Sequence, residues 1–227
     1  MTAHLVKLQP APDLVDQVYR ALLDAISEGT LVPGARLTQE DIAERLAVSR
    51  QPVLQALRLL KKDGLVLDAP GRGLLVAPLD AARIAHVYEI RGALDTLAAR
   101  LAADRHAVLD PKLIENGRRT ARGKNIQAMI EADMTFHNAV YAASGNPLIA
   151  QSAHLHWVHL RRVMGAVLQQ SRQREALWDE HEAIAKAIAR GDAKHATTLI
   201  AHHGRQASEN LLARLTDVLA LPMKGTS

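Results

Sequence analysis

Asp133 and His137 lie four residues apart, and this spacing places both side chains on one face of a helix. His181 supplies a further imidazole. The adjacent His202 and His203 supply another, because only one of two neighbouring helical side chains can point inward. The chain has no cysteine, so a metal site must use imidazoles and carboxylates. One carboxylate and three imidazoles suit a divalent cation such as zinc, nickel, manganese or iron(II), with positions left for water or an oxygen-rich ligand.

The same residue types also have an ordinary structural interpretation. Asp and His at this spacing occur as hydrogen-bonded pairs on helix surfaces, and most of the 11 histidines are expected to bind no metal. His154, His156 and His159 form another local group. Their spacings of two and three residues differ from the spacing of four, and no acidic residue lies near them. We therefore do not expect these three to be ligands.

The elements that must position these residues are helices. From residue 83 onward, apolar residues recur at helical spacing without a strand pattern. Asp110, Asn125 and Asn146 are expected to open helices, and Gly191 to close one. Six helices with short connections predict an antiparallel bundle, whose facing helices can hold a metal. The expected helices cover about residues 84–106, a segment starting at 110, and about 125–143, 146–169, 173–190 and 192–219.

The first 80 residues have a different organisation. Three short amphipathic helices are followed by two β-like runs joined by a turn that contains Gly71 and Gly73. Two helices separated by a short turn form a helix-turn-helix, and the hairpin after it has the form of a wing. The predicted fold class is therefore mainly α: an N-terminal winged helix-turn-helix and a C-terminal all-α antiparallel bundle. The N-terminal helices are expected at residues 13–28, 38–47 and 49–64, and the β runs at 65–67 and 74–76.

The third helix of this region has no acidic residue between Ser49 and Lys62, and it begins with side chains suited to DNA. Arg50 can pair with guanine, Gln51 with adenine, and Ser49 with a phosphate. Arg58 lies further along the helix, and Arg72 on the wing could enter the minor groove or meet a phosphate. The alternative is that each Arg is an ordinary solvated surface charge.

Overall charge does not support DNA binding by itself. The net charge is +4, but residues 1–80 contain nine Lys or Arg and ten Asp or Glu. The hypothesis of DNA binding therefore depends on where the charges lie. The N-terminus has no apolar core of a signal peptide, and no stretch approaches the roughly 20 apolar residues of a membrane span, so we expect a cytoplasmic protein.

The N-terminal pattern resembles the DNA-binding domain of the GntR family over about residues 13–78. The resemblance implies a homodimer that binds a short palindromic operator, with Arg50 in contact with DNA. Leu54 stands where the family usually has a second DNA-contacting Arg, so the operator sequence is not implied. A Leu here could touch a thymine methyl group or pack elsewhere. The matching segments read PGARL at 33–37, IAERL at 42–46, VSRQPV at 48–53, DGLV at 63–66 and GRG at 71–73.

The C-terminal pattern resembles the FCD ligand-sensing domain of the FadR subfamily over about residues 83–215. The resemblance implies one divalent metal per subunit, preferably zinc or nickel, held by one aspartate and three histidines. It also implies a small organic acid as effector. Arg91 is the candidate for its carboxylate, with a structural ion pair as the alternative, and Arg161 and Arg162 are weaker candidates. The implied ligands are Asp133, His137, His181 and His203, with His203 preferred over His202 by its distance from Asp192.

These observations predict a DNA-binding regulator, expected to be a repressor, whose affinity for double-stranded operator DNA is controlled by a carboxylate effector at the metal. Two alternatives stay open: a metal-dependent enzyme built on a helical bundle, and a regulator of the same fold that binds no metal. The expected organisation is a tail (1–12), the winged helix-turn-helix (13–78), a hinge (79–82), the helical effector domain (83–219) and a C-terminal tail (220–227).

Overall fold

The computed structural model describes residues 14–167 and 175–220, which fall into two compact units. The first contains the described residues up to Pro78, apart from 27–29, and the second begins at Leu79. Among the described residues, no helix is both long and apolar enough to cross a membrane. The expected end of the fourth bundle helix, at 169, and the expected start of the fifth, at 173, lie outside the described residues. The N-terminal tail also lies outside them, and of the C-terminal tail only residue 220 is described.

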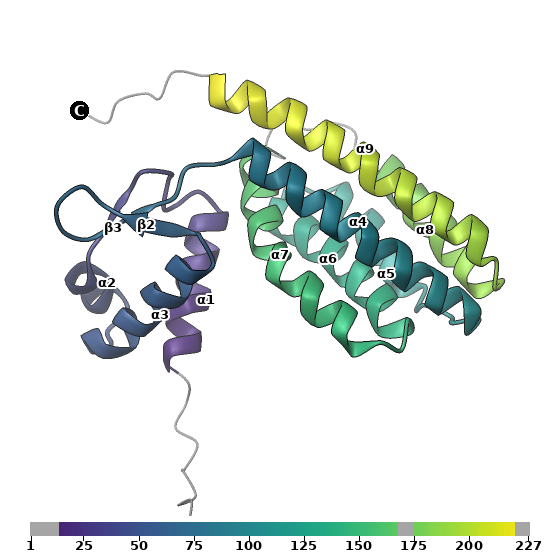
Figure 1. The fold of residues 1–227 in the computed structure, drawn as a ribbon, viewed down its shortest axis with the longest axis horizontal. Helices are drawn as coiled ribbons and strands as arrows, with labels where there is room; N and C mark the ends of the chain where they lie inside the picture. The colour runs from purple at the N-terminus through teal and green to yellow at the C-terminus, as the bar shows by residue number, and fades with distance from the viewer. Residues whose placement is uncertain (1–13, 168–174, 221–227) are drawn as a thin grey trace, which may run out of the picture. The chain divides into compact units, whose positions relative to one another are not determined.

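The described residues of the N-terminal unit form three helices and a small sheet (Figure 1). Its core joins the apolar faces of the helices to the sheet through residues such as Val18, Val53, Leu60 and Val76. The strand order is β1-β3-β2, and both pairings are antiparallel. The predicted winged helix-turn-helix is confirmed, and β1 was not predicted. The elements are α1 (Leu14–Ser27), β1 (Arg36–Leu37), α2 (Gln39–Arg45), α3 (Arg50–Lys62), β2 (Val66–Asp68) and β3 (Leu74–Val76).

Local chemistry sets the ends of the two helices of the helix-turn-helix. The Thr38 hydroxyl accepts a hydrogen bond from the backbone N–H of Asp41 and caps α2. Ser49 occupies the N-cap position of α3, but its side chain makes no capping hydrogen bond. Ser49 therefore precedes the helix by position alone. In the wing, Gly71 and Gly73 have φ values of 87° and 96°, a conformation that side-chain-bearing residues adopt at a cost.

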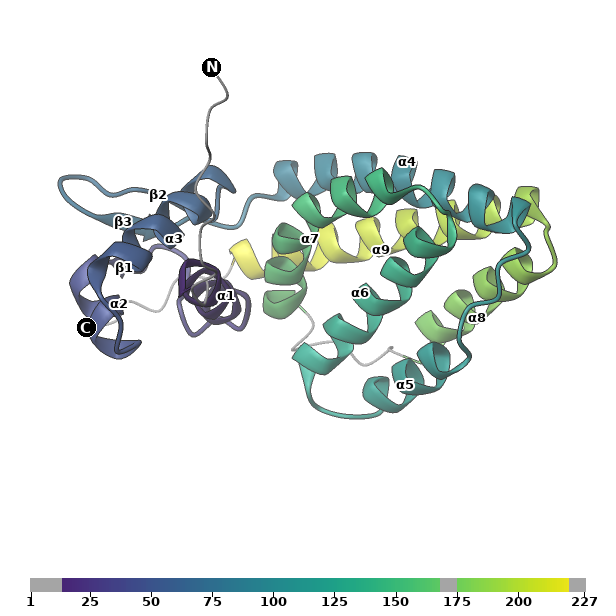
Figure 2. The same ribbon diagram turned by 90° about the horizontal axis from the view of Figure 1, so that it is seen from below.

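Over residues 79–167 and 175–220, the C-terminal unit is a bundle of six helices (Figures 1 and 2). The expected cap at Asn125 is present, and the side chains of Asp80 and Asp192 also each accept a backbone N–H at the start of a helix. The first helix begins earlier than expected, because Asp80 caps it and residues 81–82 of the expected hinge are helical. The helices are α4 (Ala81–Asp104), α5 (Lys112–Ala121), α6 (Ile126–Ala143), α7 (Pro147–Val167), α8 (Ala176–Ala189) and α9 (Ala193–Ala220).

The two long helices α4 and α9 lie side by side and run in opposite directions (Figures 1 and 2). Helices α6, α7 and α8 pack against them and enclose one continuous apolar core. Alanines at positions 98, 99, 102 and 103 line the buried side of α4 and are almost completely buried. Their small side chains allow close helix contact. Polar side chains buried inside this core therefore require an explanation, because each needs a partner.

Candidate metal centre and DNA-binding surface

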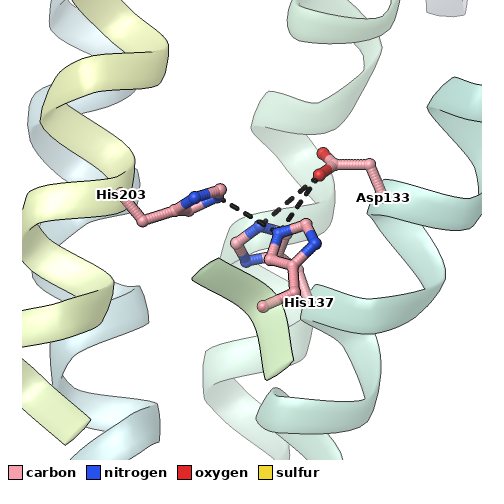
Figure 3. Close-up of side chains that lie close together, drawn as sticks. Asp133, His137 and His203 are labelled. Atoms are coloured by element: carbon pink, nitrogen blue, oxygen red, sulfur yellow. Dashed lines mark hydrogen bonds and ion pairs between the residues drawn. The ribbon is translucent and has the colours of Figure 1, made fainter. Parts of the chain in front are cut away.

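Four polar side chains meet inside the bundle. Asp133 and His137 lie on α6, His181 on α8 and His203 on α9, and all four are buried. Each offers one ligand atom, and these atoms lie within 4.8 Å of one another. Figure 3 shows the side chains of both α6 residues and of His203 directed toward a common point. The structure therefore brings together the four residues that the sequence singled out.

The distances within this cluster fit a shared cation. His181 Nε2 lies 3.5 Å from Asp133 Oδ1 and 3.2 Å from His203 Nε2, and His137 Nε2 lies 4.0 Å from Asp133 Oδ1. Both ring nitrogens of His137 are buried without a hydrogen-bond partner. Such unpaired atoms are costly inside a protein, and a metal in contact with Nε2 would remove this cost. The donor set of one carboxylate and three imidazoles fits a divalent transition metal.

Burial also favours the neutral form of two of the imidazoles, His137 and His181. Loss of solvation lowers the pKa of His137, and the positive charge of Arg91 acts in the same direction. Loss of solvation lowers the pKa of His181 well below its usual value, with contributions from His203 and His137. Both rings are therefore neutral near pH 7, which is the form of histidine that binds metals.

Aromatic rings enclose the cluster on two sides. Phe136 stacks on His181 with 4.2 Å between ring centroids, and Trp178 meets the same ring edge-on at 4.6 Å. Trp157 lies 5.7 Å from the ring of His137. These rings fix the orientation of the imidazoles and exclude water from the site.

Arg91, the residue predicted to contact an effector, is buried on α4 next to the cluster. Its Nε lies 3.3 Å from Asp95 Oδ2, and its guanidinium carbon lies 4.1 Å from the centre of the Trp157 ring. Asp95 in turn accepts a hydrogen bond of 2.5 Å from the hydroxyl of Tyr141. The structural ion pair is therefore present. Sequence reasoning missed Asp95, although its spacing of four from Arg91 places both on one helix face.

The other histidines considered from the sequence lie elsewhere. His202 is exposed, whereas its neighbour His203 is 3% exposed, so the buried one of the pair belongs to the cluster. On α7, His154 is exposed, and His159 is buried with its Nε2 3.0 Å from a guanidinium nitrogen of Arg83. Among the described residues, these α7 histidines join no metal-binding group.

The predicted DNA contacts are all on the surface of the N-terminal unit. Arg50 at the start of α3 forms an ion pair with Glu40 of α2, with 3.0 Å between Nη1 and Oε1. Leu54 is half-buried and lines a hollow of about 280 Å³ with Leu57, Gly73 and other residues of α3 and the wing. Its side chain therefore borders a hollow between α3 and the wing. The exposed candidates are Ser49, Arg50, Gln51, Arg58 and Arg72.

The pair between Glu40 and Arg50 gives a first prediction. Both side chains are more than half exposed, so the pair contributes little to stability, but it would compete with DNA for Arg50. Glu40→Gln is expected to tighten DNA binding by up to about 1 kcal/mol. Fluorescence anisotropy with labelled duplex DNA measures this change. Glu44→Gln removes the same charge from α2 and is the control; equal affinities of the two variants would contradict the prediction.

Comparison with known proteins identifies the family. Residues 14–76 match the family described as bacterial regulatory proteins of the gntR family, and residues 86–206, more than half of the chain, match the FCD domain. The chain belongs to the GntR family and carries an FCD domain. The resemblance seen in the sequence is thus confirmed, and the GntR helix-turn-helix implies that the protein binds DNA.

Relatives of this GntR protein are named as transcriptional regulators. A regulator of Bacillus subtilis strain 168, named as an uncharacterized HTH-type transcriptional regulator YdhC, is 31% identical over 57% of this chain, which spans 60% of that relative's length. A protein of Paenarthrobacter nicotinovorans, named as a probable D-xylose utilization operon transcriptional repressor, is 26% identical over 84% of this chain and 85% of its own. The structure of Escherichia coli McbR/YncC superposes with a TM-score of 0.76 at 22% identity, covering 89% of this chain and 98% of that one.

The family matches and the names of the relatives decide between a regulator and an enzyme, two interpretations that the sequence left open. The chain is a transcriptional regulator of the GntR type with an FCD domain, and the family indicates a regulator rather than an enzyme. The metal-dependent enzyme is therefore not supported.

Proposed function

We propose that this protein is a repressor whose affinity for operator DNA is controlled by a small organic acid bound at a metal in the C-terminal bundle. The observation that carries the proposal is the buried cluster of Asp133, His137, His181 and His203. Those residues would hold one divalent metal, preferably zinc or nickel. The metal would supply a positive centre for a carboxylate.

The charges around the cluster favour an anionic effector. Asp133 and Asp95 contribute two buried carboxylates, and Arg91 contributes one buried guanidinium. A dication added to these buried groups leaves one positive charge, which the partly exposed Glu180 next to His203 offsets only in part because solvent screens its carboxylate. A monocarboxylate would neutralise it. Arg91 lies close enough to influence Asp133 and His137 electrostatically, which supports it as the cation that faces the acid.

Control of DNA binding requires that the effector prefers one of two states. We propose that the acid changes the positions of the bundle helices and, through residues 79 and 80 of the expected hinge, also moves the two DNA-reading domains of a cytoplasmic homodimer. A changed separation of the domains would no longer match the two halves of the operator. The proposed domains are those expected from the sequence, with DNA read by residues 13–78 and the effector bound by residues 83–219.

In the DNA-reading domain we propose that Arg50 and Gln51 contact bases, while Ser49, Arg58 and Arg72 contact the phosphate backbone or the minor groove. Arg50→Ala is expected to weaken operator binding by about 1–3 kcal/mol, because a bidentate contact to guanine is lost. Titration against operator and unrelated duplexes measures this loss. A loss of equal size on both duplexes would show that Arg50 contacts phosphate rather than a base.

The proposal is tested with the full chain in two steps. Elemental analysis of the purified protein is expected to find close to one zinc or nickel per chain, and metal-free protein would favour the remaining alternative of a regulator without metal. A thermal-shift screen of small mono- and dicarboxylic acids then seeks a ligand, because binding to the folded state raises the unfolding midpoint. An acid that stabilises the metal-loaded protein and releases it from DNA supports the proposal; stabilisation without any change in DNA affinity contradicts it.

A further inference from the structure

Two of the three imidazoles in the cluster have a carboxylate next to Nδ1, the ring nitrogen that points away from the cluster. Asp95 Oδ1 on α4 lies 3.6 Å from His137 Nδ1, the ring nitrogen opposite the one that approaches Asp133. Glu180 Oε2 on α8 lies 2.7 Å from His203 Nδ1, and the other nitrogen of this ring approaches His181. In both rings Nδ1 faces a carboxylate and Nε2 faces the cluster.

This arrangement has a known chemical consequence for histidine as a ligand. A ring that donates its Nδ1–H to a carboxylate carries its free electron pair on Nε2, so both the tautomer and the ring orientation are fixed. The carboxylate also makes Nε2 more basic. His181 is held differently: its ring packs against Phe136 and Trp178, and its buried Nδ1, like that of His137, has no hydrogen-bond partner.

Asp95 is itself held firmly for this role. It is 2% exposed, accepts the hydroxyl of Tyr141 on Oδ1 and faces Arg91 on Oδ2. Helix α4 offers no side chain to the cluster itself, so Asp95 is its link to the cluster through His137.

We propose that Asp95 and Glu180 are positioning residues of the metal centre: Asp95 orients His137 and Glu180 orients His203, each by accepting an Nδ1–H. This inference rests on the proposed metal site. Glu180 precedes the ligand His181 in the sequence, yet it serves a ligand on the neighbouring helix. Helix α4 thereby contributes to metal affinity without providing a ligand.

The test compares Asp95→Asn and Glu180→Gln with the wild type in the full-length protein. Each variant keeps the shape of the side chain but removes its charge, and each is expected to raise the Kd for zinc by about 10- to 100-fold, measured by competition with a chelator. Glu182→Gln is the matched control, because it removes the same charge from α8 at a residue that pairs with Arg118 and Lys186. This control is expected to leave the Kd within about threefold of the wild type.

Nuclear magnetic resonance of zinc-loaded protein labelled with ¹⁵N gives a readout that a purely structural role would not change. His137 and His203 are each expected to show a slowly exchanging Nδ1–H, and the two signals should shift separately in Asp95→Asn and Glu180→Gln. A variant that binds zinc within about threefold of the wild type overturns the role of its carboxylate.

Asp95→Asn leaves Arg91 without its carboxylate partner and could fail to fold. In that event the wild-type spectrum decides: absence of a protected His137 Nδ1–H overturns the role of Asp95, and Tyr141→Phe should shift this signal while retaining the carboxylate. A wild type that binds neither zinc nor nickel overturns both this inference and the proposed function. A wild type that binds metal, with variants that bind equally well, overturns this inference alone.

Discussion

Replacing His181 by alanine is expected to abolish metal binding and, with it, the response of DNA binding to an organic acid. His181 is fully buried, and its Nε2 lies between Asp133 Oδ1 and His203 Nε2, at 3.5 and 3.2 Å. Its removal takes away the central imidazole, and the remaining side chains are too few for a stable four-ligand site. Elemental analysis and chelator competition measure the loss, and anisotropy with and without the acid measures the response.

The effect should also appear in stability. A ligand that binds only the folded state stabilises it by about 2.7 kcal/mol when its concentration is 100 times the Kd. Zinc or nickel is therefore expected to raise the unfolding midpoint of the wild type and to leave that of His181→Ala unchanged. Because DNA is bound by the other unit, the metal-free variant should still bind duplex DNA.

The control for this prediction is His202→Ala. His202 neighbours the cluster residue His203 but is exposed, so its loss should leave metal content and metal-dependent stability unchanged. Should His181→Ala fold poorly, Asp133→Asn removes a ligand with almost no change of shape. Full metal content in either of these two variants would mean that the metal is bound elsewhere.

The fold was largely predictable from the sequence because its signals are local. Helical spacing of apolar residues, together with caps such as Thr38 and Asn125, places most helices within a few residues of their observed ends. Strand β1 was missed because two residues carry no periodicity. It exists because Arg36 and Leu37 pair with β3, a contact that depends on tertiary structure.

The candidate site was predictable only in part. Spacing on one helix connects Asp133 with His137, but distances between helices are set by packing. Asp95 and Glu180 were missed for this reason, since their partners His137 and His203 are more than 20 residues away in the sequence. The choice of His203 over His202 came from the family resemblance, and the burial of His203 agrees with it. Metal binding by these residues stays a prediction.

Gly117→Ala is expected to destabilise the C-terminal unit by about 1–2 kcal/mol. Gly117 is buried in α5, and a Cβ atom there would overlap the indole ring of Trp178 on α8. Trp178 is 3% exposed and packs on Phe136 and His181, so it has no free space into which to move. Overpacking of this kind costs about 1–3 kcal/mol, and sometimes more, which outweighs the gain of about 1 kcal/mol from the higher helix propensity of alanine.

Gly92→Ala is the matched control, because Gly92 lies within α4 and a Cβ atom there would meet nothing within 4 Å. Only the gain in helix propensity remains, so this variant should be about 0.5–1 kcal/mol more stable than the wild type. Chemical denaturation of the two metal-free variants measures the difference. Because Trp178 also orients His181, Gly117→Ala should in addition weaken zinc binding. A Gly117→Ala protein as stable as Gly92→Ala would show that α5 and α8 are not packed as closely as described, and Trp178 would lose its role in fixing the imidazole.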